Sequence, residues 1–396
     1  MVENIGVDAD QFAALVLQQL NDIGEQDAQY DPDEFQIVVG SWNLYLGNIF
    51  RETTGLPAAE RDARIARFVA TVRDNDEPDA WPEARSALRP ILRPNAFGLD
   101  SPSEDMRPIT RPAFPFVDEL VAIDRPNSRS IVSAATLDRW GISADEVFDA
   151  ARENLRAMVG SSGIKQAGLL HFGDNGDGYC TSWPLVPGWL AGSGDGQHRS
   201  IAFMPDVDTL IITPDTGDLA PLFEHVEKHY REAVRPISPQ GYTVDDHGTV
   251  IPLDQSPRHR HLPFVQRARC GLAVTEYDAQ TQALNDAMEN DYTYPHHEDL
   301  APAFVGSVLY VGSDNGPYTA TVWGEDVEYL LPEADSVVFC TERNGEMITL
   351  FETPFPAVAE ITGLTPIPDM SPRRYEIRHW PNPETLARLE AAAVSR

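Results

Sequence analysis

The feature that most constrains the fold of this chain is an order of helix and strand signals that occurs twice, in residues 140–237 and 276–368. In each stretch a helical pattern leads to a strand, an Asp-Asn-Gly turn and a second strand. A proline followed three residues later by aspartate then precedes a β-branched strand and another helix. The turns are Asp174-Asn175-Gly176 and Asp314-Asn315-Gly316, and the matched aspartates are Asp208 and Asp335. The recurrence indicates an internal duplication of a helix–sheet–helix module, with the Gly-rich residues 187–196 as a loop insertion in the first copy.

A chain of 396 residues exceeds one ordinary hydrophobic core and predicts two or three domains. Residues 94–108 show little periodicity and many turn formers, and residues 252–263 have the composition of a linker. The predicted domains are an N-terminal helix–hairpin–helix domain of residues 1–93, a central α+β domain of residues 105–255 and a C-terminal α+β domain of residues 264–396. Because short turns join neighbouring strands, the predicted fold class is α+β, with antiparallel sheets and helices packed on one face.

Helix caps and tight turns give the sharpest local predictions. Asp8 with Gln11, and Ser143 with Glu146, have the spacing of capping boxes ahead of apolar residues at helical intervals. Asn344-Gly345 and Asp246-His247-Gly248 are expected to join the strands of two hairpins. Further helices are expected near residues 57–72, 219–234, 273–288, 358–362 and from 383 onward. Strands are expected near residues 35–39, 44–46, 168–172, 179–183, 201–204, 209–213, 304–311, 318–323, 337–340, 347–351 and 375–378.

The charge of the chain is strongly acidic, with 62 acids against 30 bases and a net charge of −32. Such a field opposes binding to nucleic acid and to anionic membranes, and it favours a basic partner. No apolar stretch approaches the length of about 20 residues that a membrane span needs, and no signal peptide is visible at the N-terminus. The cysteines, Cys180, Cys270 and Cys340, are odd in number and far apart, which argues against a disulfide framework. A cytoplasmic location is expected.

Sequence motifs for common chemistries are missing from the chain. It has no dinucleotide-binding glycine pattern, phosphate loop, nucleophile elbow, H-E-x-x-H helix or cysteine pair at zinc spacing. The segment Gly192-Ser193-Gly194-Asp195-Gly196 lacks the lysine of a phosphate loop, and Asp174-Asn175-Gly176-Asp177-Gly178 lacks the closing glutamate of a calcium loop. No cofactor or metal is therefore expected.

Two clusters of histidines leave alternatives open. His296-His297-Glu298-Asp299 is either a solvated loop or a metal site, and neighbouring side chains that point apart favour the loop. Arg258-His259-Arg260-His261 is a small basic island that either neutralises nearby carboxylates or recognises an anionic group. Arg258 and Arg260 are therefore candidate binding residues.

Tryptophans and the two matched aspartates supply the other candidate site residues. Trp183, Trp189 and Trp323 line either a binding face or the core, and core packing is the better interpretation for most of them. Asp208 and Asp335 either orient a partner or form ordinary turns at strand ends. An enzymatic alternative would assemble its site from His171, Asp174, His198, Asp208 and the loop of residues 296–299, as a hydrolase-type acid–base site.

The first 250 residues resemble an uncharacterised bacterial family named after YtpQ. The resemblance lies in Leu44-Tyr45-Leu46-Gly47-Asn48, in Trp140-Gly141-Ile142-Ser143 with Ala151-Arg152-Glu153-Asn154-Leu155, and in Phe203-Met204-Pro205 with Asp208. Because that family has no established activity, the resemblance implies a fold unit and leaves function open. The C-terminal third departs from it. In architecture the chain is also similar to type III secretion chaperones and YbjN-like proteins, which bind polypeptides without catalysis.

These observations favour a non-catalytic binding, chaperone-like or adaptor-like protein. It would recognise another polypeptide, basic in charge, through a sheet face or edge with apolar anchors inside an acidic rim. A hydrolase-type enzyme and a structural subunit of an assembly are the alternatives. The oligomeric state stays open, with a homodimer as one alternative.

Overall fold

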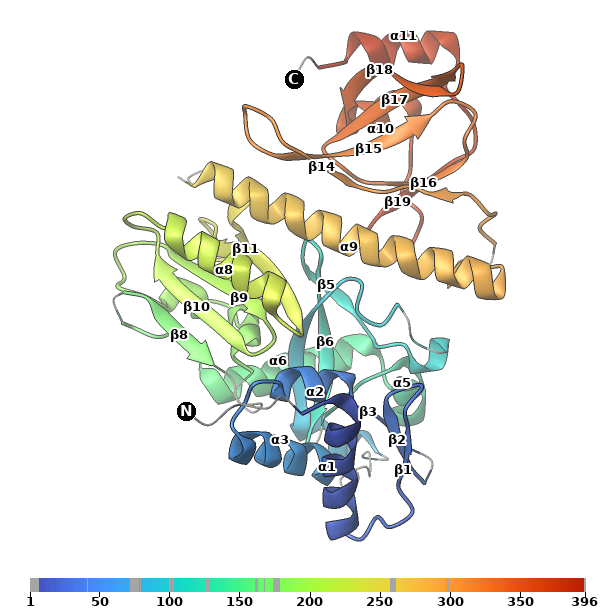
Figure 1. Cartoon of the computed structure of the whole chain (residues 1–396). Helices are drawn as coiled ribbons and strands as arrows, with labels where there is room; N and C mark the ends of the chain where they lie inside the picture. Colours follow the sequence, from blue (N-terminus) through green and yellow to red (C-terminus); the bar gives the residue numbers. More distant parts are fainter. Residues whose placement is uncertain are drawn as a thin grey trace.

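The computed structural model describes residues 7–394 except residues 41, 72–77, 79, 100, 102, 126–128, 161–162, 167, 174–178, 257–260, 296 and 298. Its elements form three successive tiers, an N-terminal unit, a central pair of sheets and a C-terminal unit, with one long helix between the last two (Figure 1). The fold is α+β with mainly antiparallel sheets, as predicted. No helix in the described part of the chain is long and apolar enough to cross a membrane.

The N-terminal unit packs helices against one small antiparallel sheet of order β1-β2-β3. Asp8 and Gln11 form the predicted capping box of the first helix. Phe12, Val16 and Leu20 of that helix are buried in the unit's core. The elements are α1 (Ala9–Asp22), β1 (Gln29–Asp31), β2 (Gln36–Val39), β3 (Trp42–Tyr45), α2 (Gly47–Thr53) and α3 (Ala58–Ala70).

The first central sheet begins inside the predicted N-terminal domain. Strand β4 (Leu88–Pro94) pairs along its whole length with β6 (Val117–Asp124). The expected domain boundary after residue 93 is therefore wrong, because it falls within a strand of the central sheet. The opposite edge of β6 pairs with β5 (Arg111–Phe114) and with β7 (Arg129–Ile131). The low periodicity of residues 94–108 reflects a long connection within this sheet.

Helices cover one face of this first sheet. A short helix, α4 (Trp81–Ala84), precedes β4, and α5 (Ala134–Trp140) and α6 (Ala144–Val159) follow β7. The Ser143–Glu146 capping box is present at the start of α6. Glu119 of β6 is fully buried and accepts bidentate hydrogen bonds from Arg111 and Arg152. The bonds from Arg152 fix α6 to the sheet.

The second central sheet has the antiparallel order β12-β11-β9-β10-β8. Its strands are β8 (Leu170–Gly173), β9 (Ser200–Asp206), β10 (Thr209–Pro214), β11 (Pro236–Val244) and β12 (Val250–Pro252). Helix α8 (Ala220–Glu232) covers one face through Phe223 and Val226. The other face shares one core with the first sheet. The strand expected at residues 179–183 is instead a 3₁₀ helix (Cys180–Leu185), which fills that shared core ahead of α7 (Trp189–Gly192).

Helix α9 (Leu262–Asp291) lies between the central and C-terminal units. On the central side Val265 joins the core under α8, and Glu276 accepts a bond from the backbone of Ala96. On the C-terminal side Arg269 forms a two-pronged ion pair with Asp335, and Tyr277 bonds to the backbone of Arg373. The helix begins earlier than predicted, and both of its long faces are engaged.

The C-terminal unit holds two sheets. One has the order β13-β16-β19 and the other has the order β14-β15-β17-β18. The strands are β13 (Phe304–Val305), β14 (Leu309–Val311), β15 (Tyr318–Gly324), β16 (Tyr329–Pro332), β17 (Ser336–Arg343), β18 (Glu346–Pro354) and β19 (Arg374–Ile377). Helices α10 (Phe355–Thr362) and α11 (Pro383–Ala391) pack on a core around Trp323, Phe339 and Phe355.

The sheet topology argues against the predicted duplication. In the first stretch Pro205 and Asp208 lie where β9 turns into its antiparallel neighbour β10. In the second stretch Pro332 and Asp335 lie between β16 and β17, which belong to different sheets. Strand β17 then pairs in parallel with β15, which has no counterpart in the first stretch. The two stretches therefore share local signals and do not share one module.

Candidate functional site

The predicted tryptophan face does not exist in the described structure. Trp189 is 1% exposed, and Trp183 packs edge to face between Trp189 and Phe172 beneath the second central sheet. Trp323 is 3% exposed and stacks on Phe339 in the C-terminal core. These side chains stabilise cores, so the preferred interpretation of core packing is confirmed and the alternative of a binding face is wrong.

The two matched aspartates form ion pairs at separate places. Asp335 accepts bonds from Arg269 and from the backbone and hydroxyl of Thr319. Burial opposes its ionisation, but these bonds outweigh burial and hold the pKa of Asp335 below its usual value. Asp208 pairs with Arg235 at 2.8 Å in the turn between β9 and β10. Both aspartates therefore hold elements together. The other two charged candidates, Arg258 and Arg260, lie outside the described residues.

The residues proposed for a dispersed enzyme site do not converge. His171 lies exposed on the edge strand β8, and Asp208 and His198 lie at opposite ends of β9. His198 bonds to Asp195 within its own loop. His297 and Asp299 follow the C-terminal end of α9. Asp174, His296 and Glu298 lie outside the described residues.

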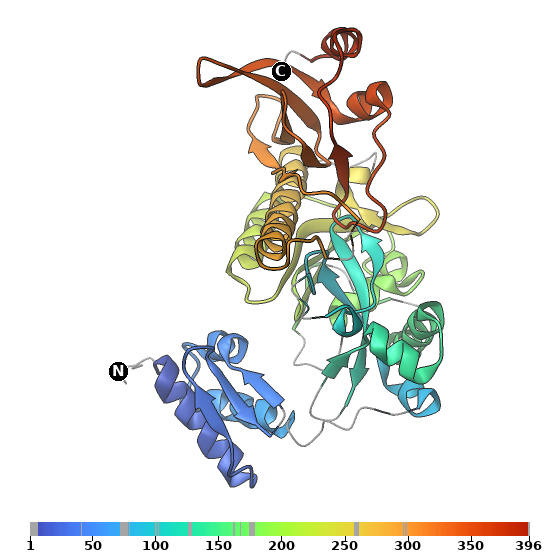
Figure 2. The same ribbon diagram turned by 90° about the vertical axis from the view of Figure 1, so that its right-hand side faces the viewer.

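An exposed hairpin in the C-terminal unit is the clearest candidate for a binding surface. Strands β17 and β18 are joined by Asn344-Gly345, both with positive φ, as predicted for a two-residue turn. Every residue from 342 to 350 is exposed. In Figure 2 this hairpin reaches away from the rest of the C-terminal unit. Met347, Ile348 and Leu350 are 61%, 38% and 41% exposed, so three large apolar side chains face solvent on one strand.

The hairpin also presents a free strand edge. Strand β18 ends the sheet order, so one of its edges has no strand neighbour in that sheet. Beyond residue 351 the chain covers this edge itself, because the Val394 amide donates to Glu352 and Thr353 bonds to Leu389 of α11. In the described structure residues 346–350 have no such cover. The opposite edge strand β14 is only three residues long and packs near α9.

Charged side chains lie beside the apolar residues of the hairpin, and all of them except Arg343 are acidic. Glu342 and Glu346 lie on the hairpin itself, and Glu325, Asp326 and Glu328 lie exposed on the neighbouring connection between β15 and β16. This connection touches the hairpin base, since the amide of Glu325 bonds to the Cys340 carbonyl. We call Glu325–Glu328 and Glu342–Leu350 the hairpin surface. It combines apolar anchors with an acidic border.

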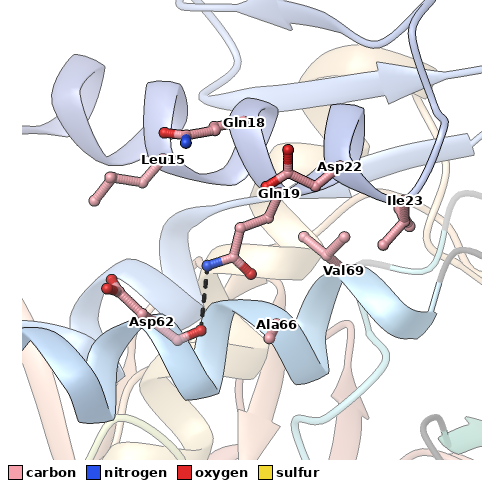
Figure 3. A pocket seen from close by; sticks show the side chains of 8 residues that line it. All are labelled: Leu15, Gln18, Gln19, Asp22, Ile23, Asp62, Ala66 and Val69. Atoms are coloured by element: carbon pink, nitrogen blue, oxygen red, sulfur yellow. Dashed lines mark hydrogen bonds between the residues drawn. The ribbon is translucent and has the colours of Figure 1, made fainter.

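A groove in the N-terminal unit is the first of two hollows that we describe. It has a volume of about 380 Å³ and lies between α1 and α3 (Figure 3). Leu15, Ile23 and Val69 supply its apolar lining, and Gln19 crosses it to bond to the backbone of Asp62 at 3.2 Å. Because Gln19 ties the two helices together, the groove is a shallow gap in helix packing with no convergent reactive groups.

The second hollow, of about 450 Å³, lies beside the C-terminal half of α8. His225, Lys228, His229 and Glu232 come from α8, and Asp206 comes from the end of β9. His229 Nε2 lies 2.8 Å from Asp206 Oδ2. No prediction from the sequence includes these residues, although two histidines four residues apart in an expected helix share one face.

Comparison with protein-family models, curated proteins and solved structures finds no match for this chain. The resemblance to the YtpQ family therefore stays a prediction.

Proposed function

We propose that this protein binds an extended, basic polypeptide segment along strand β18 of the hairpin surface. The observation that carries the proposal is an uncovered edge of residues 346–350 that exposes Met347, Ile348 and Leu350. A bare strand edge offers backbone donors and acceptors to a further strand, and side chains that alternate along it select the partner.

Charge determines which partner fits the edge. A second copy of this chain would bring its own acids against Glu342, Glu346 and Glu325, and the net charge of −32 adds long-range repulsion. A segment with lysine or arginine between aliphatic residues gains from both the border and the apolar anchors. The proposed partner is therefore a basic polypeptide, which agrees with the expectation from the sequence.

The alternative of a hydrolase-type enzyme has less support. Its proposed residues lie on separate elements, and in the described part of the chain no three His, Cys, Asp or Glu side chains gather as a metal site would require. A structural subunit of an assembly would use the hairpin for contacts between copies. The oligomeric state of the protein in solution tests that alternative.

The first experiment measures binding of a labelled peptide of about ten residues in which valine alternates with lysine. We expect fluorescence anisotropy to show binding to the wild-type chain and no binding of a matched valine–glutamate peptide. Met347→Gln and Leu350→Asn keep the charge of the hairpin and remove its apolar anchors. Each is expected to weaken binding of the lysine peptide about tenfold or more, which corresponds to about 1.4 kcal/mol.

Met158→Gln is the matched control, because Met158 is an exposed methionine on the surface of α6. It is expected to leave the affinity unchanged. Equal binding by wild type and both hairpin variants would show that charge alone attracts the peptide and would overturn the proposal. A concentration-dependent dimer in sedimentation that Met347→Gln dissolves would instead favour the assembly alternative.

A further inference from the structure

Three arginines, Arg89, Arg93 and Arg129, share one face of the first central sheet. The strand register places Arg89 of β4 opposite Ala122 of β6, and Arg93 lies four residues further along the same strand. Arg129 of β7 lies opposite Asp124 of β6. Directly opposite residues, and residues an even number apart on one strand, point to the same side of a sheet. The three arginines are therefore on the side where Ala122 joins the core between the two central sheets.

Two of these arginines pair with no carboxylate in the described part of the chain. Arg93 donates from Nη1 to the carbonyl of Leu92 at 2.7 Å, and its guanidinium lies 5.7 Å from the centroid of the Phe97 ring. Arg89 donates to two backbone carbonyls, and its Nε is buried without a hydrogen-bond partner. Both residues are half-buried. In a chain with 62 acids against 30 bases, such arginines indicate that a bound molecule supplies the anion.

Arg129 is held in place by an aromatic ring. Its guanidinium lies 4.2 Å from the centroid of the Tyr179 ring, and the Tyr179 hydroxyl donates to Asp124. Arg129 Nε and Asp124 Oδ1 are 3.6 Å apart, which is too long for a hydrogen bond. The contact with Tyr179 therefore orients Arg129, and its N–H groups stay able to donate to a ligand.

The surroundings of Arg93 also favour an anion. Burial and the like charges of Arg235 and Arg129 lower the pKa of Arg93 to about 10. Arg235 is already neutralised, because it pairs with Asp208 at 2.8 Å and with Glu52 at 3.3 Å. Arg93 has no such compensation. An anion bound between the guanidinium groups would relieve their repulsion and replace the hydration that burial removes.

We propose that Arg89, Arg93 and Arg129 bind a phosphoryl group, either of free phosphate or of a small phosphate ester. The planar guanidinium fork matches paired phosphate oxygens, and phosphate carries enough charge for more than one arginine. The net charge of −32 repels nucleic acids and other extended polyanions, so only a small ligand gains more from the local cluster than it loses to this field. Tyr179 positions Arg129.

The phosphate site is independent of the proposed peptide binding. It lies on the central unit, whereas the hairpin surface belongs to the C-terminal unit. Met347→Gln is therefore expected to leave phosphate affinity unchanged, and Arg93→Gln is expected to leave peptide affinity unchanged.

The test is calorimetric titration of the full chain with sodium phosphate and with phenyl phosphate, at constant ionic strength. We expect one saturable site per chain. Tighter binding of phenyl phosphate would assign the site to phosphate esters, and tighter binding of sodium phosphate would assign it to the free ion. Arg89→Gln, Arg93→Gln and Arg129→Gln are each expected to weaken binding about tenfold or more, because each removes a charged donor. Arg388→Gln, at an exposed position of α11, is the matched control, with no effect expected.

Unfolding in urea first shows that each variant is folded. Arg93→Lys keeps the charge and the aliphatic stem, so it replaces Arg93→Gln if that variant unfolds, and loss of the guanidinium fork is still expected to weaken binding. Absence of saturable binding to the wild-type chain would overturn the proposal. So would an affinity that none of the substitutions of Arg89, Arg93 and Arg129 reduces, or one that Arg388→Gln reduces equally.

Discussion

Two carboxyl groups are buried where α9 meets the central unit. Glu276 is 3% exposed and bonds to the Ala96 amide at 2.9 Å, and Asp118 of β6 lies nearby at 5% exposure. Burial raises the pKa of Glu276 from 4.5 to about 7, and the neighbouring charge of Asp118 adds to the rise. Burial also raises the pKa of Asp118. This junction is therefore most favourable when its carboxyls are protonated.

Glu276→Gln is expected to make folding less dependent on pH. In the wild type, the unfolded chain ionises this group above about pH 4.5, whereas the folded chain keeps it protonated until about pH 7. Stability is thus fully present below the unfolded pKa and is lost as pH rises through the folded pKa. Between about pH 5.5 and pH 8.5 the variant should gain about 2 kcal/mol relative to wild type, as measured by urea unfolding.

Glu289→Gln, at an exposed position of the same helix, is the control for this measurement. It should show no gain relative to wild type between the two pH values. If Glu276→Gln gave the same difference from wild type at both pH values, the buried carboxyl would not couple folding to protonation.

The sequence predicted residue roles well where they depend on a few neighbours. The capping boxes of Asp8 and Ser143 and the turn at Asn344-Gly345 are present, because cap and turn geometry is decided within four residues. The role of Trp189 depends on which elements fold over it, and no local pattern carries that information. His225 and His229 were detectable from their spacing, but the contact of His229 with Asp206 requires the fold.

At the scale of elements, most predicted helices and strands are present and the misses have physical causes. Residues 179–183 have β-forming side chains, but Pro184 and packing between the two sheets favour a 3₁₀ helix. Helix α9 begins at Leu262 and was expected only from residue 273. Because it is engaged on two faces, its apolar residues form no single stripe and the usual periodic signal is lost.

A buried arginine fixes α9 to the C-terminal unit. Arg374 of β19 is 0% exposed and donates to Gln280 and Thr281 of α9 and to the carbonyls of Gly306 and Leu330. These partners are all neutral, and burial lowers the pKa of Arg374 to about 10. The side chain therefore joins three segments through oxygen acceptors.

Arg374→Met is expected to destabilise the chain by about 3 kcal/mol or more, because several buried acceptors lose their donor. Urea unfolding followed by tryptophan fluorescence measures this loss. Arg373→Met is the matched control, since the neighbouring side chain is 69% exposed and makes only a 3.9 Å ion pair. Its effect should stay within about 0.5 kcal/mol. Equal stability of the two variants would contradict the role given to Arg374.

At the scale of the whole molecule, the sequence predicted the α+β class and misplaced the boundary after residue 93. The predicted boundary at residue 93 followed a weakly patterned stretch, yet β4 finds its partner in β6 across that stretch. The duplication rested on the order of local signals, whereas strand pairing depends on contacts between distant segments. The order of helices and strands along the chain is therefore easier to predict from the sequence than the pairing of strands.

The net charge of −32 gives a prediction for the molecule as a whole. Like charges repel more strongly in the compact chain than in the unfolded chain, and salt screens that repulsion. Raising NaCl from about 20 mM to about 500 mM should therefore raise the melting temperature by several degrees. Calorimetry with an uncharged osmolyte of equal osmolarity is the control. A falling melting temperature would mean that ion pairs dominate over repulsion.

The unbroken course of α9 has a mechanical consequence. Its 30 residues make a rod of about 45 Å. The first central loop binds it through Glu276, and the C-terminal unit grips it through Arg269, Tyr277 and Arg374. A force applied to the projecting hairpin would therefore reach the central sheets through the continuous helix α9. We therefore expect force to pass between the central and C-terminal units through this helix.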